Sequence, residues 1–151
     1  MHIKELISKE SITLELKSTD KDSVIRELAS IMKNGGTVTD LEAFITAINE
    51  RESEGSTGVG FGVAIPHAKS VGVRKPGLVF GRADHPVPYA SHEENAADLF
   101  FMIAAPEGEK NIHLQTLAKL STNLIDEASR ARLRKAKTKQ DILSILSEID
   151  A

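Results

Sequence analysis

The chain has 151 residues, 40% of them hydrophobic and 27% charged, a composition typical of one globular domain. Its 19 basic and 22 acidic side chains give a net charge of −3, without the broad positive field that binding to nucleic acid or anionic lipid requires. The absence of cysteine excludes disulfides and thiolate metal sites. No apolar stretch approaches the roughly 20 residues of a membrane-spanning helix, and no signal peptide is recognisable. We therefore expect a soluble cytoplasmic protein whose single domain covers residues 1–151.

The first third of the chain predicts one strand and two helices. Residues 12–16 alternate apolar and polar side chains, which indicates a strand. Residues 21–33 carry apolar side chains at helical spacing and are followed by glycines that end the helix. A second helix begins at Thr39 or Asp40 and has Arg51 and Glu52 near its end.

A glycine-rich segment separates the second helix from a short strand. Residues 53–62 contain four glycines and predict a loop in which the backbone can approach another group closely. Residues 63–65 predict a short buried strand. Pro66 ends that strand, so we expect His67 just beyond a strand end rather than inside the sheet.

The rest of the chain predicts two strands and three helices. Residues 78–83 and 98–105 form the strands, and the apolar run in the second predicts a central strand covered on both faces. Helices are predicted over residues 112–125, 129–136 and 139–149. Strands interleaved with helices predict an α/β fold, a three-layer sandwich with a mostly parallel or mixed central sheet flanked by helices.

Three side chains have the chemistry that a phosphoryl carrier needs. Such a carrier requires an exposed nucleophile that is uncharged near pH 7, and imidazole meets this condition. His67 follows a strand, Arg51 leaves a helix just before the glycine-rich loop, and His113 lies in the first turn of a helix. An arginine fork and a helix N-terminus both supply donors to a phosphoryl group. Spacing alone does not bring these three residues together.

Two sequence motifs resemble those of a known family. Residues 51–69, RESEGSTGVGFGVAIPHAK, resemble the active-site signature of the enzyme IIA domain of the bacterial sugar phosphotransferase system, fructose/mannitol type (EIIA type 2). Residues 113–120, HLQTLAKL, match the second motif of that family. The upstream helices and the apolar strand before Pro106 fall in the family's order, so the resemblance covers essentially the whole chain.

The resemblance implies a function and a set of partners. His67 would accept a phosphoryl group on Nε2 from the phosphorylated carrier protein HPr. It would pass the group to a cysteine of an EIIB domain, which phosphorylates a fructose- or mannitol-class sugar during uptake through the membrane component EIIC. The chain would act as a phosphotransferase component, without metal, nucleotide or other cofactor. An alternative is a regulatory module of the same fold, of the nitrogen-related branch, in which phosphorylation of His67 controls a protein contact.

The resemblance also assigns roles to individual residues. His113 would be the second active-site histidine, Arg51 the phosphate-stabilising arginine, and Glu52 a supporting residue. The backbone of the glycine-rich segment would shape the site, at Gly58, Gly60 and Gly62.

Three further features have plainer interpretations. Residues 85–89, HPVPY, depart from the family's pattern after the third strand, and we expect them to form a turn at the rim of the docking surface. His85 and His92 are interpreted as surface-loop residues rather than metal ligands, because no third ligand is well placed. The basic residues between positions 130 and 139 alternate with apolar ones and are interpreted as a solvated helix face.

Overall fold

The computed structural model describes residues 2–89, 96–109 and 111–149, without the side chains of Ile112 and His113. The described strands form one mixed sheet in the order β1-β5-β6-β3-β2, with β4 also paired to β6. Only β1–β5, β3–β6 and β4–β6 are parallel pairs. The strands are β1 (Ile12–Thr13), β2 (Gly58–Gly60), β3 (Val63–Ala64), β4 (His67–Ser70), β5 (Gly77–Val87) and β6 (Ala97–Pro106).

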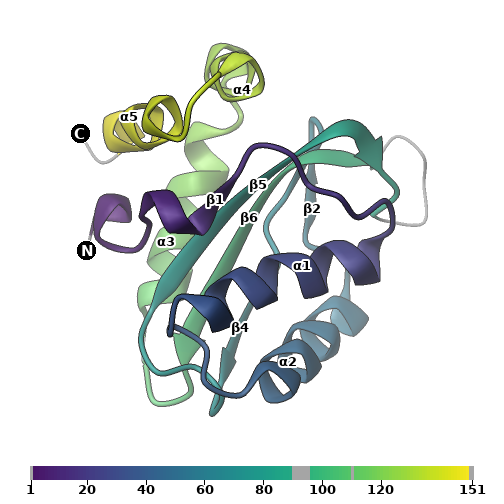
Figure 1. Ribbon diagram of the computed structural model, residues 1–151, viewed down its shortest axis with the longest axis vertical. Coiled ribbons are helices and arrows are strands. Elements are labelled where there is room, and N and C mark those ends of the chain that lie inside the picture. Colours follow the sequence, from purple (N-terminus) through teal and green to yellow (C-terminus); the bar gives the residue numbers. More distant parts are fainter. Residues whose placement is uncertain (1, 90–95, 110, 150–151) are drawn as a thin grey trace.

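Two amino-terminal helices cover one face of this sheet (Figure 1). They are α1 (Lys21–Asn34) and α2 (Leu41–Glu54). Each begins at an aspartate whose side chain accepts a backbone N–H from the first turn, Asp20 in α1 and Asp40 in α2. Their apolar stripes pack on the sheet, with Leu28 and Phe44 fully buried. The two predicted helices are confirmed.

The opposite face is covered by the carboxy-terminal helices and the start of the chain (Figure 1). In the described part of the chain, every helix is too short or too polar to traverse a lipid bilayer. The elements on this face are α3 (Ile112–Asn123), α4 (Glu127–Lys135), α5 (Lys139–Ile149) and two 3₁₀ turns, η1 (Ile3–Glu5) and η2 (Lys9–Ser11).

Strand β6 is the centre of both cores, as its apolar sequence predicts. Its alternate side chains enter opposite core clusters: Phe101 faces α3 to α5, whereas Phe100 faces α1 and α2. Both phenylalanines are completely buried. The predicted three-layer sandwich with a mixed sheet is thereby confirmed.

The chain between α2 and β5 differs from the prediction in two respects. Helix α2 continues to Glu54, and Gly58–Gly60 pairs with β3 as strand β2, so the predicted loop over residues 53–62 is shorter. His67 does not follow a strand end; it is the first residue of β4 and pairs with Ile103 of β6. Pro66 interrupts the strand, but the chain then rejoins β6 in the register that β3 began.

Candidate active site

His67 lies at the start of β4, beside α2 and α3. His67 is only 8% exposed. The sequence predicts an exposed nucleophile, so this histidine is more buried than expected. His67 nevertheless lines a surface cavity of about 390 Å³. The cavity therefore gives the largely buried His67 access to the protein surface.

The backbone next to His67 determines its tautomer. Nδ1 lies 2.7 Å from the carbonyl oxygen of Ile65. A carbonyl oxygen can only accept a hydrogen bond, so Nδ1 must carry the proton and donate it. In the neutral ring, the lone pair then resides on Nε2.

The break in the strand at Pro66 makes this hydrogen bond possible. The N–H of Ile65 donates to the carbonyl of Thr57 at 3.0 Å, and the carbonyl of Pro66 accepts from Ile103 at 2.9 Å. The carbonyl of Ile65 is thus directed to the imidazole rather than to the ladder with β6. A proline followed by histidine in this position uses one carbonyl to orient the ring.

The cavity contains charges of both signs. Arg51 and Lys69 supply positive charge, and Glu50 and Glu54 supply negative charge. The remaining lining residues are His67, Ala47, Ala68 and Leu114. The sequence interpretation did not identify Lys69, because it puts His67 outside the strand. Once His67 begins β4, alternation puts Lys69, two residues later, on the same side of the strand.

Arg51 leaves the last turn of α2 and lines the cavity with His67. Its Nη1 donates to the carbonyl oxygen of Gly55 at 2.8 Å, which ties the guanidinium to the loop that follows the helix. A guanidinium has five N–H donors, so this bond uses only part of the fork. The structure therefore brings together two of the three residues that the motifs single out.

The third residue, His113, lies in the first turn of α3. Its side chain is outside the described part of the structure, and its approach to His67 stays a prediction. The next residue, Leu114, lines the cavity and is 52% exposed. The N-terminus of α3 thus borders the site.

Glu52 faces the interior, although its neighbour Arg51 faces the cavity. Its carboxylate is 6% exposed and lies 3.0 Å from Nζ of Lys21. It also accepts from the backbone N–H of Thr57 at 3.2 Å and from the Thr57 hydroxyl. The hydroxyl of Tyr89 donates to the same carboxylate at 3.0 Å.

The predicted turn over residues 85–89 is therefore wrong in its details. His85 and Pro86 are exposed within β5, but Tyr89 is only 3% exposed and belongs to the interior polar group around Glu52. Burial, followed by the negative charge of Glu52, raises the pKa of Tyr89 far above its usual value. Sequence reasoning missed this residue because its partner lies on a distant helix.

The glycine-rich segment forms a hairpin, and its glycines are not among the residues that line the cavity. Gly60 and Gly62 have φ angles of +87° and +80°. A Cβ at Gly62 would lie 2.5 Å from Nη2 of Arg134 and 2.7 Å from Oδ1 of Asp98. This glycine is needed for a close approach of the hairpin to an ion pair.

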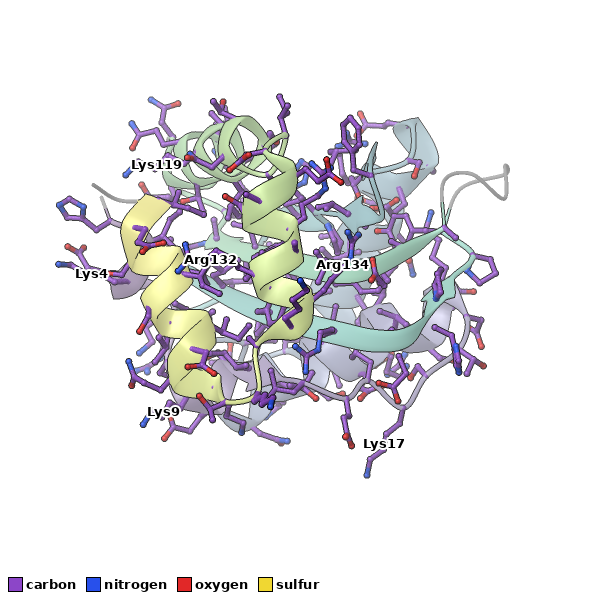
Figure 2. All side chains as sticks on the ribbon, turned by 90° about the horizontal axis from the view of Figure 1, so that it is seen from above. Lys4, Lys9, Lys17, Lys119, Arg132 and Arg134 are labelled. Carbon is purple, nitrogen blue, oxygen red and sulfur yellow. The ribbon has the colours of Figure 1, made fainter. Side chains whose placement is uncertain are left out.

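Two arginines of the basic segment are structural, which corrects its interpretation as a solvated helix face. Arg134 binds Asp98 with two nitrogens, at 2.8 and 2.9 Å. Arg130 is 7% exposed and donates to the last carbonyls of the preceding helix region. Figure 2 shows Arg132 between α4 and α5, where it pairs with Glu148.

Within the described ranges, no three His, Asp or Glu side chains gather closely enough to hold a metal ion. His92 lies outside those ranges.

Several proteins of known family are similar to this chain. A fructose-specific EIIABC component from Bacillus subtilis (strain 168) is 42% identical over 99% of the chain, which spans only 24% of that relative. A fructose-specific EIIA component from Haloferax volcanii is 38% identical, over 93% of the chain and 91% of the relative. A nitrogen regulatory protein from Bradyrhizobium diazoefficiens is 35% identical, over 97% of the chain and 95% of the relative.

Solved structures show the same fold. The nitrogen regulatory protein IIA-Ntr from Neisseria meningitidis superposes with a TM-score of 0.88, at 26% identity, over 95% of this chain and 98% of that one. The mannitol IIA of Escherichia coli, in complex with phosphorylated IIB, gives 0.81 at 29% identity, over 94% and 97%. The family model of the phosphoenolpyruvate-dependent sugar phosphotransferase system, EIIA 2, matches residues 5–149. The chain therefore belongs to this EIIA family of phosphoryl-transfer components.

Proposed function

We propose that this chain carries a phosphoryl group on Nε2 of His67, accepts it from phosphorylated HPr and donates it to a cysteine of an EIIB domain. One observation carries the proposal: the Nδ1 proton is held by the carbonyl of Ile65, so the lone pair lies on Nε2. His67 also lines a surface cavity together with Arg51.

The transfer follows from this tautomer. The Nε2 lone pair forms a bond to phosphorus while the bond between phosphorus and the donor breaks, and the electron pair of that bond stays on the donor. The ring of His67 then carries positive charge, which the carbonyl oxygen at 2.7 Å stabilises through the Nδ1 proton. In the second step a cysteine thiolate bonds to phosphorus, and the Nε2 pair returns to the ring. Neither step requires Nδ1 to gain or lose a proton.

The charges in the cavity suit a carrier that must also release its cargo. Arg51 and Lys69 supply donors for phosphoryl oxygens, each charge-assisted bond being worth about 1.5 to 3 kcal/mol. Glu50 and Glu54 line the same cavity and repel an anionic group. Two cations balanced by two carboxylates orient the phosphoryl group without trapping it.

The proposed partners rest on the relatives. Two of them are named as fructose-specific components, one with the EIIA, EIIB and EIIC parts in its name. The mannitol IIA was solved in a complex with phosphorylated IIB. By analogy, a fructose- or mannitol-class EIIB docks over the cavity, where exposed Leu114 offers apolar surface, and EIIC is reached only through EIIB.

A regulatory role is the second candidate. It is favoured by the nitrogen regulatory relative at 35% identity and by the TM-score of 0.88 to IIA-Ntr. In that role, His67 accepts the phosphoryl group in the same way, but its phosphorylation changes a contact with a regulated protein. The two candidates differ in the fate of the phosphoryl group: transport passes it to EIIB, whereas regulation keeps it on His67.

The test is incubation with phosphorylated HPr and mass spectrometry of the intact chain. We expect one added phosphoryl group on the natural chain and on the control variant His85→Ala, whose histidine is exposed on β5. His67→Ala should remain unlabelled, and its normal labelling would overturn the proposal. Addition of a fructose-type EIIB should then discharge His67; a label that stays on His67 would favour regulation.

A further inference from the structure

The group around Glu52 joins four separate segments of the chain. We call Lys21, Glu52, Thr57 and Tyr89 the Glu52 cluster. Lys21 is the first residue of α1, Glu52 lies in the last turn of α2, Thr57 precedes β2, and Tyr89 follows β5. The Tyr89 hydroxyl is within hydrogen-bond distance of both Oε2 of Glu52, at 3.0 Å, and Oγ1 of Thr57, at 2.8 Å.

Burial of the Glu52 cluster has a desolvation cost that an apolar core would avoid. A carboxylate that is 6% exposed loses most of its hydration and requires donors in return. Apolar side chains of similar volume would fill the same space without that cost. The polarity of the cluster therefore calls for a role besides stability.

Glu52 is hydrogen-bonded to the same loop as Arg51. Arg51 donates to the carbonyl of Gly55 at 2.8 Å, and Glu52 accepts from the N–H of Thr57 at 3.2 Å. Both hydrogen bonds therefore join the last turn of α2 to the short loop that follows it, one at Gly55 and the other at Thr57. The Glu52 carboxylate and the Arg51 guanidinium are thus hydrogen-bonded to the same short loop.

We infer that Tyr89 is a positioning residue of the phosphoryl site, acting through Glu52 to hold Arg51 at the His67 cavity. This inference rests on the proposed function. Only the hydroxyl of Tyr89 takes part, because its ring packs separately on Phe100, with centroids 5.8 Å apart. Lys21 also lies over the ring, 4.7 Å from its centroid. Tyr89→Phe therefore removes the hydroxyl and keeps the packing.

The experiment measures the rate of phosphoryl transfer from phosphorylated HPr in a double-mutant cycle. Tyr89→Phe should slow transfer by about tenfold, which corresponds to the loss of one hydrogen bond to a charged group. In an Arg51→Met background, Tyr89→Phe should slow transfer no further, because the residue it positions is gone. The matched control is Thr39→Val, which removes a hydroxyl that donates to Gly72 near the start of α2 and should leave the rate unchanged.

An independent readout follows Arg51 itself. The Nε–H of Arg51 should give an ordered NMR signal in the natural chain and a more mobile one in Tyr89→Phe. An unchanged rate in Tyr89→Phe, additive losses in the double variant, or an equally ordered Arg51 would each overturn the inference. If the natural chain takes no phosphoryl group at all, the proposed function fails instead, and the NMR comparison still decides the positioning of Arg51.

Discussion

The buried phenol of Tyr89 should lower the free energy of unfolding as the pH rises into the alkaline range. The residue is 3% exposed, and desolvation together with the charge of Glu52 raises the pKa of its phenol. In the unfolded chain the phenol is hydrated and has its ordinary pKa of about 10. It is the only tyrosine, and the chain has no tryptophan, so one phenol can be followed without interference.

The sign follows from proton binding in the two states. Below about pH 10 both states keep the phenol proton, and Tyr89 adds no pH dependence. Above that pH the unfolded state loses the proton while the folded state retains it. The free energy of unfolding therefore falls by about 1.4 kcal/mol per pH unit. At about pH 11.5 the accumulated loss is about 2 kcal/mol, a large part of the stability of an ordinary domain.

Urea unfolding at pH 9 and at about pH 11.5 measures this loss, with Tyr89→Phe as the control. Every ionisable group except this phenol is common to both proteins, so the difference between their pH slopes belongs to Tyr89. In the folded natural protein, the ultraviolet absorbance of phenolate should appear only as the chain unfolds. A phenol that ionises near pH 10 in the folded protein, or equal pH slopes in the two proteins, would refute the reasoning.

Two more substitutions test the site and its surroundings. Gly62→Ala should lower the free energy of unfolding, measured with urea, by at least about 1 kcal/mol more than Gly60→Ala does. Both substitutions put a side chain on a residue with positive φ, but only a Cβ at position 62 would collide with the Arg134–Asp98 ion pair. Equal losses would show that the hairpin shifts easily. Lys69→Met should slow phosphoryl transfer at least about tenfold through loss of a charge-assisted bond, and Lys69→Arg should restore most of the rate. An unchanged rate in Lys69→Met would remove Lys69 from the site.

The helices were predictable because their signals are local. Asp20 and Asp40 cap α1 and α2 as their sequences indicate, and the apolar stripes of both helices lie in the core. The apolar run of β6 likewise predicts a strand that is buried on both faces. Each of these patterns lies within a dozen or so residues of the chain, where periodicity and capping decide the structure.

The features that the sequence did not reveal depend on long-range pairing. His67 joins the sheet only because β6, more than thirty residues later, offers it a partner in Ile103. Tyr89 is buried because its ring packs on Phe100 in the core, where Glu52 of another element accepts its hydrogen bond. Neither contact leaves a periodic signal. His67 and Arg51 line one cavity, but their pairing was expected from the family resemblance and not from any periodic signal, and their roles stay predictions.

In the proposed function, the lone pair on Nε2 of His67 receives the phosphoryl group. The most direct measurement is phosphorus and nitrogen NMR of the chain after reaction with phosphorylated HPr, which identifies the ring nitrogen that is bonded to phosphorus. We expect phosphorus on Nε2 of His67, with the Nδ1 proton still hydrogen-bonded to the carbonyl of Ile65. Phosphorus on Nδ1, or on a different residue, would contradict it.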